Sequence, residues 1–168
     1  CKVKGNIKVS GSKNASLPIL AATLLFDKPV ELKNIPTLCS DIQTMLNLLS
    51  FFKKKIKISK NKKTITIYSP KKIRTYLPYS ISKTMRASII CLGGLITKHR
   101  KAVSAYPGGC AIGTRPINYH LDALKKLGMK FKLKGGYIHA TAKNGLKENN
   151  KINLNLSVGA SENLIIAS

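Results

Sequence analysis

The sequence is poor in acidic residues, with 6 Asp and Glu against 30 Lys and Arg in 168 residues, so its formal net charge is +24. Arginine is scarce as well, since only Arg74, Arg86, Arg100 and Arg115 occur and the other 26 basic residues are lysines. Proteins that read nucleic acids favour the planar fork of arginine. We therefore expect a lysine-biased surface and no nucleic-acid partner, while a basic nucleic-acid-binding protein stays open as an alternative.

Cysteine is also sparse, and nothing surrounds it that would suggest a metal or disulfide framework. The four cysteines, at positions 1, 39, 91 and 110, form no C-x-x-C pair, and no histidine lies at metal-ligand spacing. We expect no metal site, no cofactor and a reducing compartment. The apolar stretch 17–26 contains Pro18 and is far shorter than the roughly 20 residues that span a bilayer. The sequence therefore predicts a cytoplasmic protein without a membrane partner.

Apolar residues make up 43% of the chain and recur in patterned blocks, which excludes a disordered protein. Periodicity predicts an α/β protein with helices at 16–26, 41–51, 83–97 and 116–127, extended runs at 30–36 and 102–106, and hairpins at 56–68 and 129–140. Pro18 is expected near the first turn of the first helix. The order helix, strand, helix, hairpin thus occurs twice, about 70 residues apart, as an internal repeat.

A third unit opens at about residue 151 and contains a helix start at Ser157. The chain begins with Cys1 in place of methionine and stops at Ser168 inside an apolar run. We therefore expect these 168 residues to be part of a longer protein.

Three segments combine small residues with a rarer residue at a predicted helix entrance. The first is 11–16, where Lys13 would lie beside free backbone N–H groups, an arrangement that suits a phosphate or carboxylate. The second is 106–116, a glycine-rich loop with Cys110 near its middle and Arg115 before a helix. The third is 157–163. Structural alternatives remain for each: the helix starts could be ordinary capped helices, and Cys110 could be a free loop cysteine. Arg86 could be a snorkelling side chain.

Taken together, five motifs of the sequence resemble the enolpyruvyl transferase family. They are G-S-K-N-A-S-L-P-I-L-A-A near the start, K-T-M-R-A-S-I, P-G-G-C-A-I-G-T-R-P, H-L-D-A-L-K-K-L-G and S-V-G-A-S-E-N-L. The resemblance implies an inside-out α/β barrel domain built from three helix-strand-helix-hairpin units, truncated here in the third. Residues 1–12 would then form a strand of the other domain, and 13–168 an incomplete N-terminal domain with units at about 13–69, 80–142 and 151–168.

The resemblance also implies a reaction and its substrates. The enolpyruvyl group of phosphoenolpyruvate would pass to the 3'-hydroxyl of UDP-N-acetylglucosamine with release of phosphate, the first committed step of peptidoglycan synthesis. Addition and elimination would proceed through a tetrahedral intermediate. The Gly-Gly-Cys loop favours this acceptor over 3-phosphoshikimate, whose transferase lacks the loop and stays the second choice. A non-catalytic remnant is a further alternative, and the isolated 168 residues are not expected to turn over.

Site residues follow from the same resemblance, position by position. Cys110 matches a loop cysteine that donates a proton to the enolpyruvyl methylene, forms a covalent adduct with phosphoenolpyruvate and is alkylated by fosfomycin. The substrate-binding residues it implies are Lys13, Asn14, Arg86, Arg115, Pro116, Ile117, Asn118, Tyr119, Ser157, Val158 and Gly159. The sequence departs from the family pattern at Asn118, where Asp is common, at Asn155, where Lys is common, and at Phe51-Phe52, where Leu-Gly is common.

Overall fold

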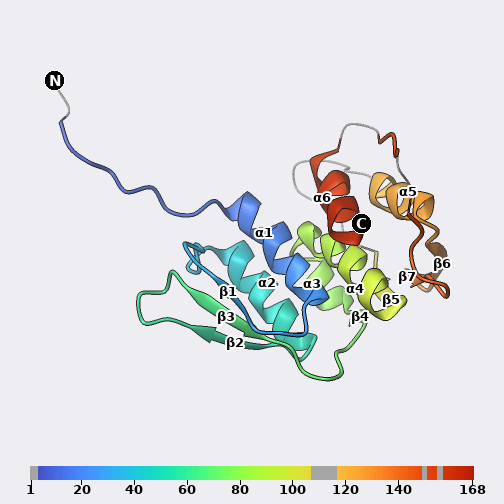
Figure 1. Cartoon of the computed structure of the whole chain (residues 1–168), viewed down its shortest axis with the longest axis horizontal. Helices are drawn as coiled ribbons and strands as arrows, with labels where there is room; N and C mark the ends of the chain where they lie inside the picture. Colours follow the sequence, from blue (N-terminus) through green and yellow to red (C-terminus); the bar gives the residue numbers. More distant parts are fainter. Residues whose placement is uncertain (1–3, 107–116, 149–150, 155–156) are drawn as a thin grey trace.

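A computed structural model describes residues 4–106, 117–148, 151–154 and 157–168 (Figure 1). Two kinds of helix occur in it. The α-helices are α1 (Lys13–Ala22), α2 (Ser40–Phe51), α3 (Tyr79–Ser82), α4 (Cys91–His99), α5 (Asn118–Lys126) and α6 (Val158–Ala167), and the 3-10 helices are η1 (Thr23–Leu25) and η2 (Arg86–Ile90). The strands are β1 (Val30–Leu32), β2 (Lys55–Ile58), β3 (Ile65–Tyr68), β4 (Tyr76–Leu77), β5 (Lys101–Ala105), β6 (Lys130–Lys134) and β7 (Tyr137–Thr141).

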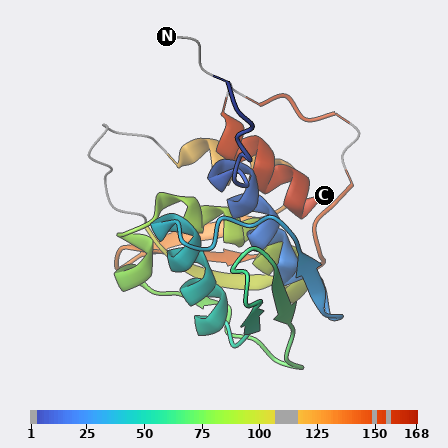
Figure 2. The same cartoon turned by 90° about the vertical axis from the view of Figure 1, so that its left-hand side faces the viewer.

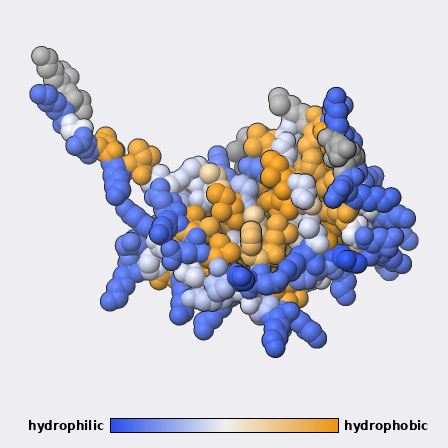
Figure 3. All heavy atoms as spheres, in the orientation of Figure 1, coloured by the Kyte–Doolittle hydropathy of each residue, from blue (hydrophilic) through white to orange (hydrophobic). Residues whose placement is uncertain are grey.

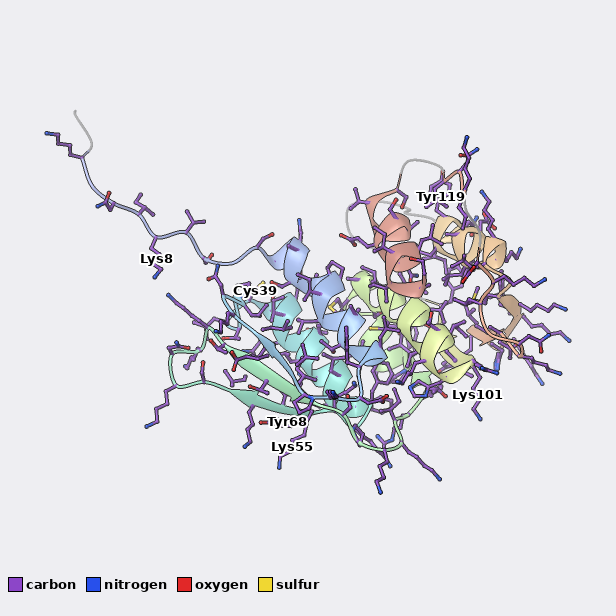
Figure 4. All side chains as sticks on the ribbon, viewed as in Figure 1. Lys8, Cys39, Lys55, Tyr68, Lys101 and Tyr119 are labelled. Atoms are coloured by element: carbon purple, nitrogen blue, oxygen red, sulfur yellow. The ribbon has the colours of Figure 1, made fainter. Side chains whose placement is uncertain are left out.

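The strands form two sheets with matching topology. The first has the order β1-β3-β2 and the second the order β4-β5-β7-β6. In both sheets a hairpin, β2–β3 or β6–β7, pairs antiparallel with the strand that precedes the unit's second helix. Figure 4 shows Lys55 and Tyr68, which are register partners on neighbouring strands of the first sheet. The order helix, strand, helix, hairpin therefore occurs twice, as the sequence predicts.

Three helices, α1, α4 and α6, pack against one another at the centre of the molecule (Figure 1). The N–H of Gly93 donates to Oδ1 of Asn163 at 2.8 Å, and one turn later the Thr97 hydroxyl donates to the Ala167 carbonyl at 3.1 Å. α4 and α6 are therefore parallel. Leu24 in η1 lies beside Gly94, and Asp27, three residues later, pairs with Lys98, four residues after Gly94, so α1 with η1 runs in the same direction as α4 and α6.

Glycine allows this close packing of the central helices. A Cβ placed on Gly93 would lie 2.4 Å from Oδ1 of Asn163, and one on Gly94 would lie 3.3 Å from Cβ of Leu24. The surrounding core is aliphatic and fully buried, with Leu20, Leu24, Leu92 and Ile96 among its members. Such a core stabilises the domain through the apolar area it removes from water.

The segment before α1 leaves the body of the molecule. Figures 1 and 2 show residues 4–12 projecting as an extended chain on the side opposite the first sheet. Ile7 and Val9 are 90% and 80% exposed, and Lys8, which lies on the same segment in Figure 4, is exposed too. Within residues 4–12 no strand is assigned, and the predicted strand pairing stays a prediction.

Helix boundaries differ from the predicted ones where local hydrogen bonding decides. α1 begins at Lys13, earlier than predicted, because the Ser12 hydroxyl accepts the Ala15 N–H. Pro18 therefore lies in the helix interior, contrary to its predicted first-turn position. Since proline has no N–H, the Asn14 carbonyl loses its usual helical partner.

Two further expectations are wrong. The helix predicted at 83–97 is interrupted, because Met85 is extended (φ −143°, ψ 103°) between α3 and η2. The extended run predicted at 30–36 ends as a strand at Leu32, because Asn34 adopts φ 58° and Ile35 instead donates its N–H to the Lys63 carbonyl. β4, a two-residue strand parallel to β5, was not predicted, and two residues are too few for a periodic signal.

The turns that follow α2 and α5 are copies of each other. Lys54 donates its N–H to the Leu49 carbonyl, as Met129 does to the Leu124 carbonyl. Lys53, with φ 71°, is therefore the counterpart of Gly128, with φ 93°. Phe52-Lys53 of the first unit is therefore the counterpart of Leu127-Gly128 of the second, and the departure from the family pattern at Phe51-Phe52 stays a prediction.

Candidate functional site

A short motif, Ser/Thr-x-x-Ala-Ser, occurs at the start of each central helix: 12–16 before α1, 84–88 before α4 and 157–161 before α6. In the first and third copies the leading serine accepts the alanine N–H at 3.3 Å. Because the three helices are parallel, their starts lie at one end of the molecule, and α1, η2 and α6 contact one another there. That end carries the predicted residues Lys13, Asn14, Arg86, Ser157, Val158 and Gly159.

Lys13 lies between the starts of two helices. Its Nζ is 2.7 Å from Oδ2 of Asp41 in the first turn of α2. The hydrogen bond to Asp41 and the charge of that carboxylate raise the pKa of Lys13 above its usual value. The ammonium is therefore charged at neutral pH, and its side chain, 44% exposed, remains accessible to an anion.

Gly11 determines how the chain enters α1. A Cβ on Gly11 would lie 1.7 Å from the Asn34 carbonyl oxygen, a distance that no side chain tolerates. The close contact ties the segment before Lys13 to the loop after β1, beside a hollow of about 280 Å³ that is also lined by Thr37 and Cys39. Glycine at this position thus serves the placement of Lys13.

The start of α5 carries three more of the predicted residues. Asn118 is exposed and Tyr119 is half-buried, whereas Ile117 is 1% exposed, so its side chain belongs to the core. Tyr119, at the start of α5 in Figure 4, lines a hollow of about 330 Å³ together with Asp122, Lys125, Lys126 and Leu154.

A buried polar network joins α5 to the central helices. Asn163 is fully buried, and its Nδ2 donates to the Ile89 carbonyl at 3.2 Å and lies 3.3 Å from Nδ1 of His120. The imidazole of His120 also packs against Gly159, where an added Cβ would lie 3.1 Å from Cε1. The network therefore connects the starts of α5 and α6, on which predicted substrate-binding residues lie, with η2 before α4.

Cys110, Arg115 and Pro116 lie outside the described residues, as does Asn155. The side chain of Arg86 is likewise not described. Of the other cysteines, Cys91 is buried, and burial raises the pKa of its thiol to about 12, which leaves it protonated and unreactive. Cys39 is free and half-buried at the start of α2.

Sequence reasoning missed Asp41 and Asn163. An acidic residue in a first helical turn, such as Asp41, is typical of a helix surface, and nothing in the sequence pairs it with Lys13. Asn163 belongs to the motif S-V-G-A-S-E-N-L, but nothing in a sequence distinguishes a buried asparagine from an exposed one. Within residues 4–106 and 117–168, apart from the short undescribed gaps, no cluster of three metal ligands occurs. No helix in that part of the chain is long and apolar enough to cross a membrane.

The family model described as EPSP synthase (3-phosphoshikimate 1-carboxyvinyltransferase) matches residues 1–168. The chain belongs to this family. Among solved structures similar to it, the enolpyruvyl transferase NikO from Streptomyces tendae has a TM-score of 0.70 at 19% identity, covering 86% of this chain and 31% of that one. An EPSP synthase from Acinetobacter baumannii has a TM-score of 0.68 at 18% identity, covering 97% and 37%. These likenesses confirm the predicted enolpyruvyl transferase fold.

Curated relatives in the EPSP synthase family are much closer in sequence. A UDP-N-acetylglucosamine 1-carboxyvinyltransferase of Pelagibacter ubique is 53% identical over 167 residues, covering 99% of this chain and 39% of the relative. An enzyme of the same name from Endomicrobium trichonymphae is 47% identical over the same length, with the same coverage. The chain thus spans about two fifths of the length of these relatives.

Proposed function

We propose that this chain is the N-terminal part of an enzyme that transfers the enolpyruvyl group of phosphoenolpyruvate to the 3'-hydroxyl of UDP-N-acetylglucosamine and releases phosphate. This reaction is the first committed step of peptidoglycan synthesis. The observation that carries the proposal is the 53% identity to a UDP-N-acetylglucosamine 1-carboxyvinyltransferase across 99% of the chain. Structural neighbours under 20% identical support the fold, and they leave the acceptor to be argued from sequence.

The geometry of the helix starts supports binding of two anionic substrates. Three parallel helices direct the positive ends of their dipoles to one end of the molecule. Lys13 lies there with its charge stabilised by Asp41. A phosphate group is favoured beside helix N–H groups and an ammonium, so we assign the phosphoenolpyruvate site to Lys13, Asn14 and Arg86. The net charge of +24 raises the encounter rate with both substrates.

The sugar nucleotide would lie on the other side of the same end. We assign it to residues 115–119 and 157–159. The contacts of His120 with Asn163 and Gly159 hold α5, which begins at Asn118, against α6, which begins at Val158. Cys110 would act from its loop as proton donor to the methylene carbon and as the nucleophile of the covalent adduct.

The complete reaction, in this proposal, also needs the part of the relatives that the chain does not span. Ile7 and Val9, exposed on the extended segment 4–12, suit a strand added to that part. Figure 3 shows hydrophobic surface over the central helices, where Ile19 on α1 and Ile165 on α6 are 47% and 73% exposed. A further hollow of about 460 Å³, lined by Leu127, Leu146 and Leu164 among others, would receive the continuation of the third unit. The site would work in the cytoplasm, as the cysteine usage suggests.

A phosphate-release assay on the full-length protein tests the proposal. Phosphate release from phosphoenolpyruvate should require UDP-N-acetylglucosamine, and 3-phosphoshikimate should not replace it. A second candidate is kept because the matching family model and one structural neighbour are EPSP synthases. Phosphate release from phosphoenolpyruvate in the presence of 3-phosphoshikimate, without UDP-N-acetylglucosamine, would favour that candidate.

Labelling tests the role of Cys110 separately. Cys110→Ala should lower turnover about a hundredfold or more, the typical effect of losing a general acid, and should abolish labelling by fosfomycin. Cys39→Ala is the matched control, a free thiol on a described helix start, and should still be labelled. Labelling of Cys110→Ala at the wild-type level would refute the assignment.

A further inference from the structure

The second copy of the Ser/Thr-x-x-Ala-Ser motif differs from the other two in its hydrogen bonds. In the first copy Ser16 donates both its N–H and its hydroxyl to the Ser12 carbonyl, at 3.1 and 2.7 Å. In the third copy Ser161 does the same to Ser157, at 3.0 Å for both bonds. The two copies thus share one helix-start geometry, and they come from units far apart in the sequence.

In the second copy these bonds are not made. The Ser88 N–H donates to the Met85 carbonyl, one residue closer than in the other copies, and the Thr84 hydroxyl turns back to the Ile81 carbonyl at 2.8 Å. The Ser88 hydroxyl is buried, with the residue 1% exposed, and has no hydrogen-bond partner. A buried hydroxyl without a partner costs free energy and calls for an explanation.

The side chain after the leading residue also differs. Lys13 and Val158, which follow Ser12 and Ser157, are exposed at the site, at 44% for the lysine side chain and 75% for the valine. Met85, which follows Thr84, is 4% exposed and extended. The burial of the Met85 side chain therefore stabilises the present form of the second copy and offsets the free-energy cost of the unsatisfied Ser88 hydroxyl.

We propose that Thr84 and Ser88 are positioning residues that convert segment 84–88 into the helix start seen in the other two copies when the phosphate-bearing substrate binds beside Arg86. The Thr84 hydroxyl then accepts the Ala87 N–H, and Ser88 donates its N–H and hydroxyl to the Thr84 carbonyl. The inference rests on the proposed function, because it takes phosphoenolpyruvate as the ligand.

The rearrangement supplies what an anion needs. Before the rearrangement, in the structure described above, the N–H groups of Thr84 and Met85 both donate to the Ile81 carbonyl. A helix that begins at Met85 frees the N–H groups of its first turn and aligns its dipole with the ligand. The rearrangement ends before Ile89, which stays in place because its carbonyl accepts a hydrogen bond from the side-chain amide of Asn163 on α6. Differential binding of the anion to the rearranged form shifts the equilibrium.

Ser88→Ala in the full-length protein distinguishes a positioning role of Ser88 from a purely structural one. The free protein loses no bond, so its thermal midpoint should not fall, while KM for phosphoenolpyruvate should rise about three- to tenfold, the value of one hydrogen bond. Ser16→Ala is the matched control, because its hydroxyl is already bonded, and it should lower the midpoint. Thr84→Ser should keep the wild-type KM, and Thr84→Val should raise it.

Hydrogen exchange on the peptides that cover 84–88 completes the test. Both substrates together should protect these amides in the wild type and not in Ser88→Ala. An active wild type with unchanged exchange at 84–88, or a Ser88→Ala KM within twofold of wild type, overturns this inference and leaves the proposed function standing. A wild type that releases no phosphate overturns both.

Discussion

Lys13 and Asp41 form an ion pair, with 2.7 Å between Nζ and Oδ2, at the point where α1 and α2 begin side by side. Asp41 raises the pKa of Lys13, but a carboxylate that close also competes with any anion for the same ammonium. If the proposed function is right, the Asp41 carboxylate occupies a position beside Lys13 that a substrate phosphate would take.

Asp41→Asn should therefore strengthen anion binding. Removing the carboxylate removes both a competitor for Lys13 and a repulsive charge, so the dissociation constant for phosphoenolpyruvate should fall about two- to fivefold, the usual range for an exposed pair. Titration calorimetry at low and high salt checks this, and the gain should shrink at high salt. Weaker binding by Asp41→Asn would show instead that Asp41 orients the lysine. Lys13→Gln, as control, should lose affinity in both backgrounds.

The repeat identifies a strained residue at the end of α2. Lys53 has φ 71°, in the left-handed region where a side chain costs about 1–2 kcal/mol, while its counterpart Gly128 has φ 93°. Lys53→Gly should raise the free energy of unfolding by about 0.5–1 kcal/mol after the entropy cost of glycine. Urea unfolding measures the change.

Lys55→Gly provides the comparison for Lys53→Gly. It lies two residues away in β2, where the backbone is extended, and it should destabilise the protein. Equal effects of the two substitutions would mean that the backbone at Lys53 is not strained.

The pattern of apolar residues predicted most of this architecture, and tertiary contacts account for the rest. The two hairpins and α2 follow from alternation and from a helical stripe, as at Ile42, Met45 and Leu49, all fully buried. The break at Met85 has no such signal, because K-T-M-R-A-S-I reads as continuous helix. Only the packing of Met85 and the bonds of Thr84 to Ile81 interrupt it.

The candidate site was predictable to a similar extent. Small residues before helices indicate where Lys13 and Ser157 lie, and the repeat explains why they meet at one end. The partners that hold them could not be read from spacing. Asn163 is 70 residues from Gly93, and Asp41 belongs to a different helix from Lys13.

Lys54 should give the stability of the protein a recognisable pH dependence. Its Nζ donates to the Thr23 carbonyl at 2.7 Å, the Phe26 carbonyl at 3.3 Å and the Ser69 hydroxyl at 2.5 Å, and the residue is 4% exposed. Burial lowers its pKa to about 8. Between that value and the ordinary lysine pKa, the unfolded chain binds a proton that the folded chain does not, so stability rises with pH in this window.

Lys54→Met isolates that contribution, because Met129 occupies the equivalent position of the second unit. From pH 8 to 10.5, wild type should gain up to about 3 kcal/mol of unfolding free energy relative to Lys54→Met. Urea unfolding at several pH values, on both proteins, gives the difference directly. A difference that stays constant over this range would show that Lys54 titrates as an ordinary surface lysine.

Asn163 should be among the most sensitive polar residues of the domain. Its amide accepts from Gly93 and donates to Ile89, so Asn163→Ala leaves a buried N–H and a buried carbonyl without partners. The expected loss is about 2–4 kcal/mol of unfolding free energy, the cost of two unsatisfied buried groups. Asn47→Ala, an exposed asparagine on α2, is the control and should be neutral or slightly stabilising, because alanine is the better helix former. Denaturant unfolding of the two variants separates the cases, and a loss below about 1 kcal/mol for Asn163→Ala would mean that water replaces the lost bonds.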